Sequence, residues 1–130
     1  MKTESDGLRR ALQITAFTGF SGVALGAFGA HGLRHLLEQN GTAAIWEKAV
    51  FYQLVHAVGM LALLAFRPFP RGPWTCWLAG IAVFSGSLYV LAWTGIRWLG
   101  AITPLGGVSL LAGWLWLAWA AARPGNSPES

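Results

Sequence analysis

The fold is decided by residues 74–122, which read WTCWLAGIAVFSGSLYVLAWTGIRWLGAITPLGGVSLLAGWLWLAWAAA. Arg97 is the only charged side chain in this stretch. Its two apolar parts, Trp74–Ile96 and Leu99–Ala122, are each about 20 residues or longer, enough for a helix to cross a hydrocarbon core of roughly 30 Å. Because only Arg97 and Trp98 separate them, the sequence predicts a tight antiparallel pair of membrane-spanning helices.

The rest of the chain has the same apolar character. Of its 130 residues, 55% are hydrophobic and 11% are charged, whereas about a quarter of the residues in a soluble domain are charged. Two more apolar segments, Ala11–Ala30 and Ala43–Phe66, are long enough to span a membrane. No segment alternates strictly between polar and apolar residues, so helices rather than a barrel are expected in lipid. We therefore predict an all-α fold, an integral membrane four-helix bundle with short loops.

Charged residues mark the domain boundaries and the orientation. Residues 1–10 are expected to form a cytoplasmic N-terminal tail, 11–122 the four-helix transmembrane domain, and 123–130 a cytoplasmic C-terminal tail. The basic residues on the side of the two termini are Lys2, Arg9, Arg10, Arg67, Arg71 and Arg123. Those on the other side are Arg34, Lys48 and Arg97. Because cytoplasmic loops carry the excess of Lys and Arg, this distribution places both termini in the cytoplasm.

The basic residues raise two alternatives, nucleic-acid binding and a cleaved signal peptide. Nucleic-acid binding is not expected, because the nine basic residues are scattered over segment ends rather than gathered on one face. A cleaved signal peptide is the second alternative, since a basic start, an apolar stretch and small residues ending at Ala30 fit one. Cleavage there would leave three spans.

The first apolar segment carries a face of glycines, Gly19, Gly22, Gly26 and Gly29, spaced three, four and three residues apart. On a helix this spacing gives a groove that another backbone can approach closely, as in small-xxx-small contacts of membrane helices. Two interpretations remain open. The groove either packs against a partner helix or holds a lipid or small ligand.

Polar side chains gather at mid-membrane depth on the second segment. Tyr52, Gln53 and His56 lie within about one helical turn of each other, with His56 near the centre of the span. Such groups normally face the bundle interior and suggest a functional site. The structural alternative is a neutral imidazole satisfied by Tyr52, Gln53 or a serine of another helix. The candidate functional polar cluster is His56, Gln53, Tyr52, His31, Ser85 and Tyr89.

His31 and His35 are one helical turn apart after the first segment. Such a pair can bind zinc or copper, but a third ligand is usually needed, for which Glu38 or Glu47 is available. The leucines in this stretch favour instead a short amphipathic helix in the membrane interface, ending at Gly41. We expect no bound metal and no cofactor.

The run Thr103-Pro104-Leu105-Gly106-Gly107 predicts a helix kink at Pro104, Gly106 and Gly107, because proline removes a backbone donor and glycine loosens the turn. A weak internal repeat is also present. Phe20-Ser21-Gly22 recurs as Phe84-Ser85-Gly86, which would make the bundle two parallel-repeated hairpins.

Several of these motifs together resemble the YgdD-like family, catalogued as the domain of unknown function DUF423. The motifs that carry the resemblance are Gly26–Leu33, Trp46, Ala49, Tyr52-Gln53, His56-Ala57, Phe84–Tyr89, Thr103–Gly107 and Gly113-Trp114. The resemblance implies a multi-pass protein of the bacterial inner membrane and argues against cleavage at Ala30. It implies no reaction and no catalytic residues.

Three classes of function follow. The leading hypothesis is a non-enzymatic packing, lipid-associated or accessory subunit, whose partners are membrane lipids, a second copy of the chain or another membrane protein. The alternative is a small oligomeric transporter or channel subunit that uses the His56 cluster. A membrane enzyme acting on a lipid or quinone ranks lowest, because no set of acid, nucleophile or metal ligands is complete and Cys76 is the only cysteine.

Overall fold

The computed structural model describes residues 2–124 of the chain. Its elements are α1 (Lys2–Ala30), α2 (Arg34–Asn40), α3 (Ala43–Leu63), α4 (Arg71–Thr94), the 3₁₀ helix η1 (Arg97–Ala101) and α5 (Thr103–Ala122). Within these residues there is no strand, so the prediction of an all-α fold is confirmed.

Three helices are long and apolar enough to cross a membrane by length and composition. These are Thr3–Ala30, Arg71–Thr94 and the continuous stretch Arg97–Ala122. The 21-residue α3 is not among them, since Glu47, Lys48, Gln53 and His56 lower its hydropathy. Composition within the described residues therefore supports three of the four expected spans.

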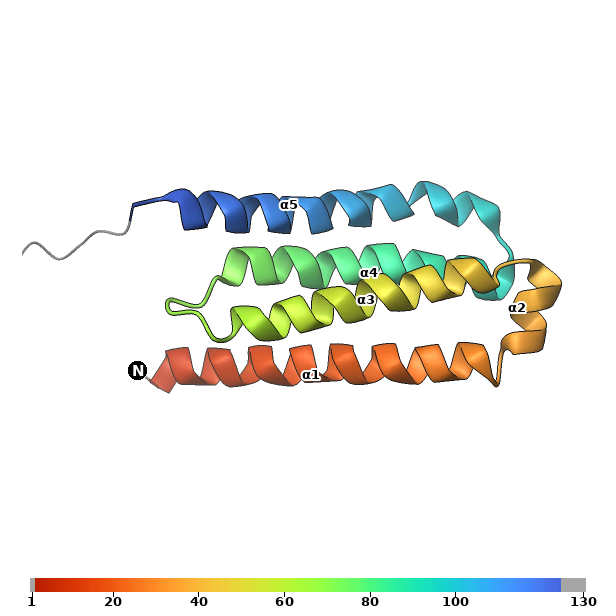
Figure 1. The fold of residues 1–130 in the computed structure, drawn as a ribbon, viewed down its shortest axis with the longest axis horizontal. Coiled ribbons are helices and arrows are strands. Elements are labelled where there is room, and N and C mark those ends of the chain that lie inside the picture. Colours follow the sequence, from red (N-terminus) through yellow and green to blue (C-terminus); the bar gives the residue numbers. More distant parts are fainter. Residues whose placement is uncertain (1, 125–130) are drawn as a thin grey trace, which may run out of the picture.

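The four long helices lie side by side in a row, with α2 crossing one end (Figure 1). Backbones pack closely between α1 and α3, between α3 and α4, and between α4 and α5. A closed four-helix bundle would also bring α1 against α5, whereas here these two helices occupy opposite edges of the row (Figure 1). The helices alternate in direction, so α1–α3 and α4–α5 form two hairpins of the same orientation.

Two boundaries differ from those expected from the sequence. Helix α1 begins at Lys2 rather than Ala11, and Glu4 in its first turn complements the positive end of the helix dipole. Pro104 lies in the first turn of α5 and therefore begins this helix instead of kinking it. Proline is tolerated there because a backbone N–H at that position has no partner within the helix. Of the expected C-terminal tail, residues 125–130 lie outside the described part of the chain.

Two glycines end helices by adopting a left-handed conformation. Gly41 follows α2 with φ 66°, and Gly95 follows α4 with φ 72°. The Gly95 N–H donates to the Leu91 carbonyl at 2.7 Å. Glycine adopts this conformation without steric cost, which lets the chain turn sharply at the helix end. A side chain at either position would be strained.

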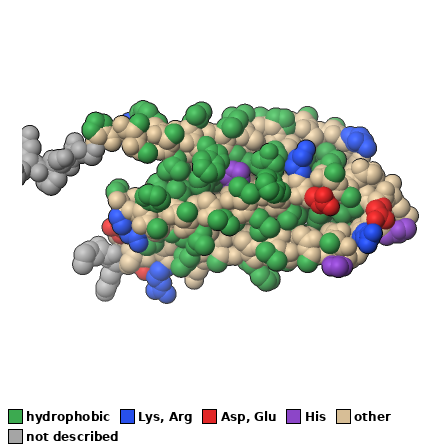
Figure 2. Space-filling view, in the orientation of Figure 1, with side chains coloured by type: hydrophobic (Ala, Val, Ile, Leu, Met, Phe, Trp, Pro, Cys, Tyr) green, Lys and Arg blue, Asp and Glu red, His purple; other side chains and the backbone are tan. Residues whose placement is uncertain are grey.

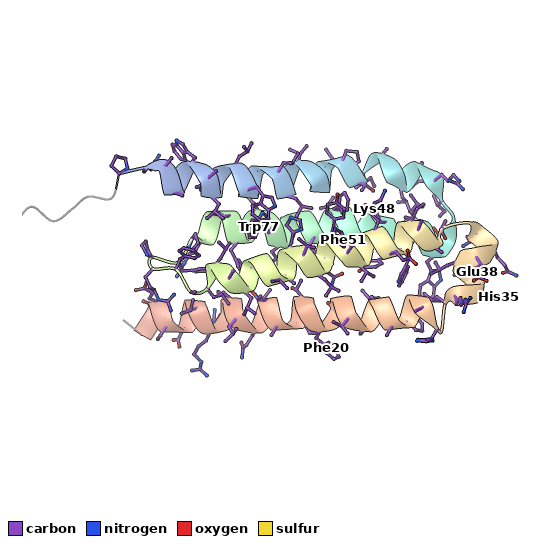
Figure 3. All side chains as sticks on the ribbon, in the orientation of Figure 1. Phe20, His35, Glu38, Lys48, Phe51 and Trp77 are labelled. Atoms are coloured by element: carbon purple, nitrogen blue, oxygen red, sulfur yellow. The ribbon has the colours of Figure 1, made fainter. Side chains whose placement is uncertain are left out.

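Apolar side chains form two buried clusters and also cover the outside. The larger cluster comprises Ala11, Met60, Leu63, Trp74, Trp77, Ile81 and Leu110. The smaller one comprises Leu33, Leu37, Trp46 and Ala92, under α2. Hydrophobic side chains also spread over the visible outer face, and charged ones lie mostly toward the two ends (Figure 2). Phe20, for example, is 69% exposed and points away from the other helices (Figure 3). Such a surface is suited to lipid rather than water.

Candidate functional site

Gln53 joins three helices through its side-chain amide. Its Nε2 donates to the Thr18 carbonyl at 3.0 Å and to Ser21 Oγ at 2.9 Å, both on α1. Its Oε1 accepts a hydrogen bond of 2.7 Å from the Tyr89 hydroxyl on α4. Because a backbone carbonyl can only accept, the bond to Thr18 fixes which end of the amide carries the nitrogen. The amide is only 5% exposed and has a protein partner on both sides.

Other polar groups on α4 and α3 also bond across helices. The Ser85 hydroxyl donates to the Ala49 carbonyl of α3 at 2.7 Å. The Trp46 indole of α3 donates to the Leu25 carbonyl of α1 at 2.8 Å, and the Trp74 indole of α4 donates to Thr15 Oγ1 at 3.0 Å. Hydrogen bonds therefore connect the inner pair of helices to one another and to α1.

His56 uses both of its ring nitrogens. Nε2 lies 3.1 Å from Trp114 Nε1 on α5, and an indole N–H can only donate, so Nε2 accepts. Nδ1 must then carry the proton, and it lies 2.8 Å from the Tyr52 carbonyl, to which it donates. The imidazole is therefore neutral in this geometry, and protonation of Nε2 would break its bond to Trp114.

Aromatic rings enclose His56. The Trp77 and Trp114 rings meet it edge-on, with centroids at 5.7 and 6.0 Å, and the Tyr52 ring lies nearly parallel to it at 6.2 Å. Trp77 lies between α4 and α5 (Figure 3) and is 1% exposed. Its Nε1 is buried without a hydrogen-bond partner among the described residues, because the Nε1–Cδ1 edge of the ring packs closely against Gly113 of α5.

The other two histidines lie elsewhere. His31 is exposed in the turn after α1, away from His56, and His35 pairs with Gln39 along α2 at 3.0 Å. No three His, Cys, Asp or Glu side chains gather as a metal site in the described part of the chain. Tyr52 is 37% exposed, and its ring lies against both His56 and Phe84 of α4, with centroids at 6.2 and 4.7 Å. The structure thus joins Gln53 to Tyr89 and His56 to Tyr52, bonds Ser85 to a backbone carbonyl of α3, and leaves His31 apart.

The glycines of α1 face α3. A Cβ at Gly22 would meet the Leu54 side chain at 2.7 Å, one at Gly26 would meet Val50 at 3.2 Å, and one at Gly29 would meet the Trp46 ring. Gly19 would meet nothing within 4 Å. Three of the four glycines therefore let α1 approach α3 closely.

A groove of about 320 Å³ opens beside these contacts, between α1 and α3. Residues that line it include Gly26, Gly29, Ala30, Trp46, Val50 and Leu54. Phe51 and Glu47 also line it, and among the described lining residues Glu47 is the one with an ionisable side chain. Its carboxylate is exposed and has no hydrogen bond or ion pair with a described residue. None of the buried polar cluster lines this groove.

Sequence reasoning missed the partners of the polar cluster. Thr18 and Ser21 lie in the glycine-rich segment, and Trp114 lies deep in the last span rather than at an interface. The depth of Trp114 was the one signal that could have suggested a bond to His56, since an indole N–H inside a membrane needs an acceptor. Spacing along the chain carries no other information about these pairs.

Comparisons with known proteins give a consistent result. Residues 25–107 match the family model described as a protein of unknown function, DUF423. A UPF0382 membrane protein of Staphylococcus saprophyticus is 46% identical over 106 residues, which cover 78% of this chain and 88% of the relative. The UPF0382 membrane protein of Haemophilus influenzae is 43% identical, covering 83% and 90%. The UPF0382 membrane protein YwdK of Bacillus subtilis is also 43% identical, covering 83% and 92%. No solved structure matches the chain.

Proposed function

Since this chain belongs to the DUF423 family of small membrane proteins, we propose that it is a non-enzymatic, lipid-associated accessory protein that crosses the membrane four times. The observation that carries the proposal is the contrast between its two kinds of polar site. The buried polar groups at mid-depth are used in hydrogen bonds between helices, whereas the accessible groove at the membrane-facing surface is mainly apolar.

The fourth span is α3. It lies between α1 and α4 over its length (Figure 1), and both neighbours are long and apolar enough to cross a membrane. Its polar side chains Gln53 and His56 are buried. Gln53 bonds to α1 and α4, and His56 accepts a hydrogen bond from Trp114 of α5. Because these two polar side chains are shielded from lipid, α3 can span a bilayer despite a lower hydropathy than its neighbours.

The proposed location is the bacterial inner membrane, with both termini in the cytoplasm. The start of α1, the loop between α3 and α4, and the end of α5 lie at the same end of the row (Figure 1). The excess of basic residues found at that end supports a cytoplasmic position for it.

Enzymatic chemistry has little support in this geometry. His56 has no free lone pair, because Trp114 occupies Nε2. The Ser85 hydroxyl bonds to a backbone carbonyl and is 1% exposed. A nucleophile or general base must reach a substrate atom, and neither group lines the groove.

The groove supplies the lipid-binding part of the proposal. It is lined by Gly26 and Gly29 of α1, by side chains of α3 and by Leu37 of α2. A flexible acyl chain fits such a shallow apolar channel without needing polar partners. The exposed apolar faces of α1 and α5 at the edges of the row leave room for further lipid or for a second copy of the chain.

Two alanines of α1 provide a matched test of lipid retention. Both are exposed, but Ala30 lines the groove and Ala27 does not. Protein purified in a mild detergent is analysed by native mass spectrometry for retained phospholipid. We expect Ala30→Trp to lose bound lipid and Ala27→Trp to retain it as the unmodified protein does. Equal lipid retention by both variants, or none by the unmodified protein, would contradict the proposal.

The alternative of an oligomeric transporter subunit has one observation in its favour. The indole of Trp77, beside His56 at mid-depth, has an N–H with no hydrogen-bond partner in the part of the chain that the structure describes. Buried polar groups at that depth often line transport pathways. Transport through the cluster would require Trp114 to move away from His56 Nε2, and a flux measurement tests this.

A further inference from the structure

A second hollow, of about 1000 Å³, opens at the end of the row opposite to α2. It lies where the first turns of α1 meet the loop between α3 and α4. Its walls include Thr3, Ser5 and Leu8 from α1, and Arg67, Phe69 and Arg71 from the loop and the start of α4. It therefore combines two guanidinium groups with apolar walls at the level where a membrane helix leaves the bilayer.

Arg67 is held in position by its own loop. Its Nη1 donates to the Leu64 carbonyl at 2.7 Å and to the Phe66 carbonyl at 2.8 Å. Both bonds are made by the Nη1 group. The N–H groups of Nε and Nη2, which form the other edge of the guanidinium, take no part in them. That edge presents the parallel pair of N–H donors that matches two oxygens of a phosphate.

Arg71 reaches from the start of α4 to α1. A Cβ placed on Gly7 would lie 2.9 Å from Arg71 Nη2, so the absence of a side chain at Gly7 makes room for the guanidinium. Neither Arg67 nor Arg71 is in an ion pair within the described residues, where the one ion pair is Arg34–Glu38 on α2. The carboxylate of Glu4 also lines the hollow, and two guanidiniums against one carboxylate leave it with a net positive charge.

We propose that this hollow binds the phosphate of an anionic phospholipid from the leaflet at this end of the protein. Arg67 and Arg71 would bind the phosphate, and Leu8 and Phe69 would contact the start of the acyl chains. The net positive charge favours a headgroup with a net negative charge over a zwitterionic one. The site is separate from the groove between α1 and α3, so it adds a headgroup-specific contact to the proposed function. If this site binds no lipid, the proposed function of the groove still stands.

The test uses the full chain in a mild detergent, titrated with phosphatidylglycerol or phosphatidylcholine and followed by native mass spectrometry. We expect phosphatidylglycerol to bind more tightly. Replacing both arginines, Arg67→Gln with Arg71→Gln, should weaken its binding by about 30-fold, from the usual contribution of each basic side chain near an anionic headgroup. Arg10→Gln is the matched control, since Arg10 is exposed on α1 and does not line the hollow. An equal loss in the control would contradict a specific site.

A second variant tests whether the position of the Arg71 guanidinium matters when the charge is unchanged. Gly7→Ala keeps every charge and favours the helical state of α1, but it displaces the Arg71 guanidinium. We expect several-fold weaker binding of phosphatidylglycerol with unchanged helix content by circular dichroism. Unchanged binding in this variant, or a wild-type chain that binds both lipids equally, would overturn the proposal. If inorganic phosphate displaced the lipid at equal concentration, the site would bind free phosphate rather than a phospholipid headgroup, which would also overturn the proposal.

Discussion

The Tyr89 hydroxyl donates a hydrogen bond of 2.7 Å to Gln53 Oε1, and the nitrogen of the same amide donates to α1. One side chain of α3 is thereby bonded to the helices on both of its sides. This arrangement explains how the Gln53 amide can lie inside the row, because it is satisfied by both neighbouring helices instead of facing lipid. Within a membrane such hydrogen bonds join helices where apolar burial cannot distinguish protein from lipid.

Gln53→Leu should destabilise the protein by about 1–3 kcal/mol, because three hydrogen bonds are lost at once. Tyr89→Phe removes one of them and should cost about 0.6 kcal/mol. Unfolding by sodium dodecyl sulfate, followed by circular dichroism in mixed micelles, measures both. Tyr52→Phe is the control, since no hydrogen bond of the Tyr52 hydroxyl is found in the described residues. If Tyr89→Phe and Tyr52→Phe changed the free energy of unfolding equally, the bond from Tyr89 to Gln53 would contribute nothing to stability.

Trp114→Phe should change the state of His56. Loss of the indole N–H leaves Nε2 without its donor, whereas the unmodified protein should show the neutral imidazole with its proton on Nδ1. Nitrogen NMR of the labelled histidine distinguishes the two ring nitrogens directly. Trp116→Phe, also on α5 but without a bond to His56, should leave the spectrum unchanged. A charged imidazole in the unmodified protein at neutral pH would rule out the geometry described above.

Gly106→Ala should separate α4 from α5. The added Cβ would meet the Phe84 backbone nitrogen and its Cα, which cannot rotate away as a side chain can. We expect a loss of stability of about 2 kcal/mol or more, typical of overpacking at a close helix contact. Gly107→Ala is the matched control, because its Cβ would lie 3.7 Å from the Phe84 ring, an ordinary contact. Thermal unfolding in detergent compares the two variants, and equal melting temperatures would show that the helices are not closely packed at Gly106.

His56→Ala should leave ion and proton flux through reconstituted liposomes at the level of protein-free vesicles, as the unmodified protein does. Its effect should appear in stability, because the bond from Trp114 and the ring contacts are lost together. A flux present with the unmodified protein and abolished by His56→Ala would instead establish the transporter alternative.

The sequence predicts the helical class and the long apolar segments well, because length and charge decide where a helix can leave the bilayer. The segment around Trp74–Ile96 corresponds closely to α4, which ends at Thr94. The start of the first helix was less predictable. Helix α1 continues back to Lys2 because the polar residues before Ala11 are compatible with a helix, and hydropathy does not report where a helix extends into water.

The mid-membrane position of His56 and Gln53 could be predicted by counting residues along a helix, but their partners could not. Thr18 and Trp114 lie 35 and 58 residues away in the sequence from Gln53 and His56. Which of several hydroxyls and indoles meets a given amide or imidazole depends on the order and rotation of the helices. The same limit applies to Pro104, whose place in a helix depends on where the preceding turn ends.

The most direct measurement of the central claim, that α3 crosses the membrane between α1 and α4, is labelling of single cysteines from one side. In a Cys76→Ser background, Gln39→Cys on α2 and Ala65→Cys after α3 both lie at exposed positions at opposite ends of α3. An impermeant maleimide added to sealed right-side-out membrane vesicles should label Gln39→Cys at once and Ala65→Cys only after detergent is added. Immediate labelling of both positions, or of neither, would show that α3 does not span the membrane.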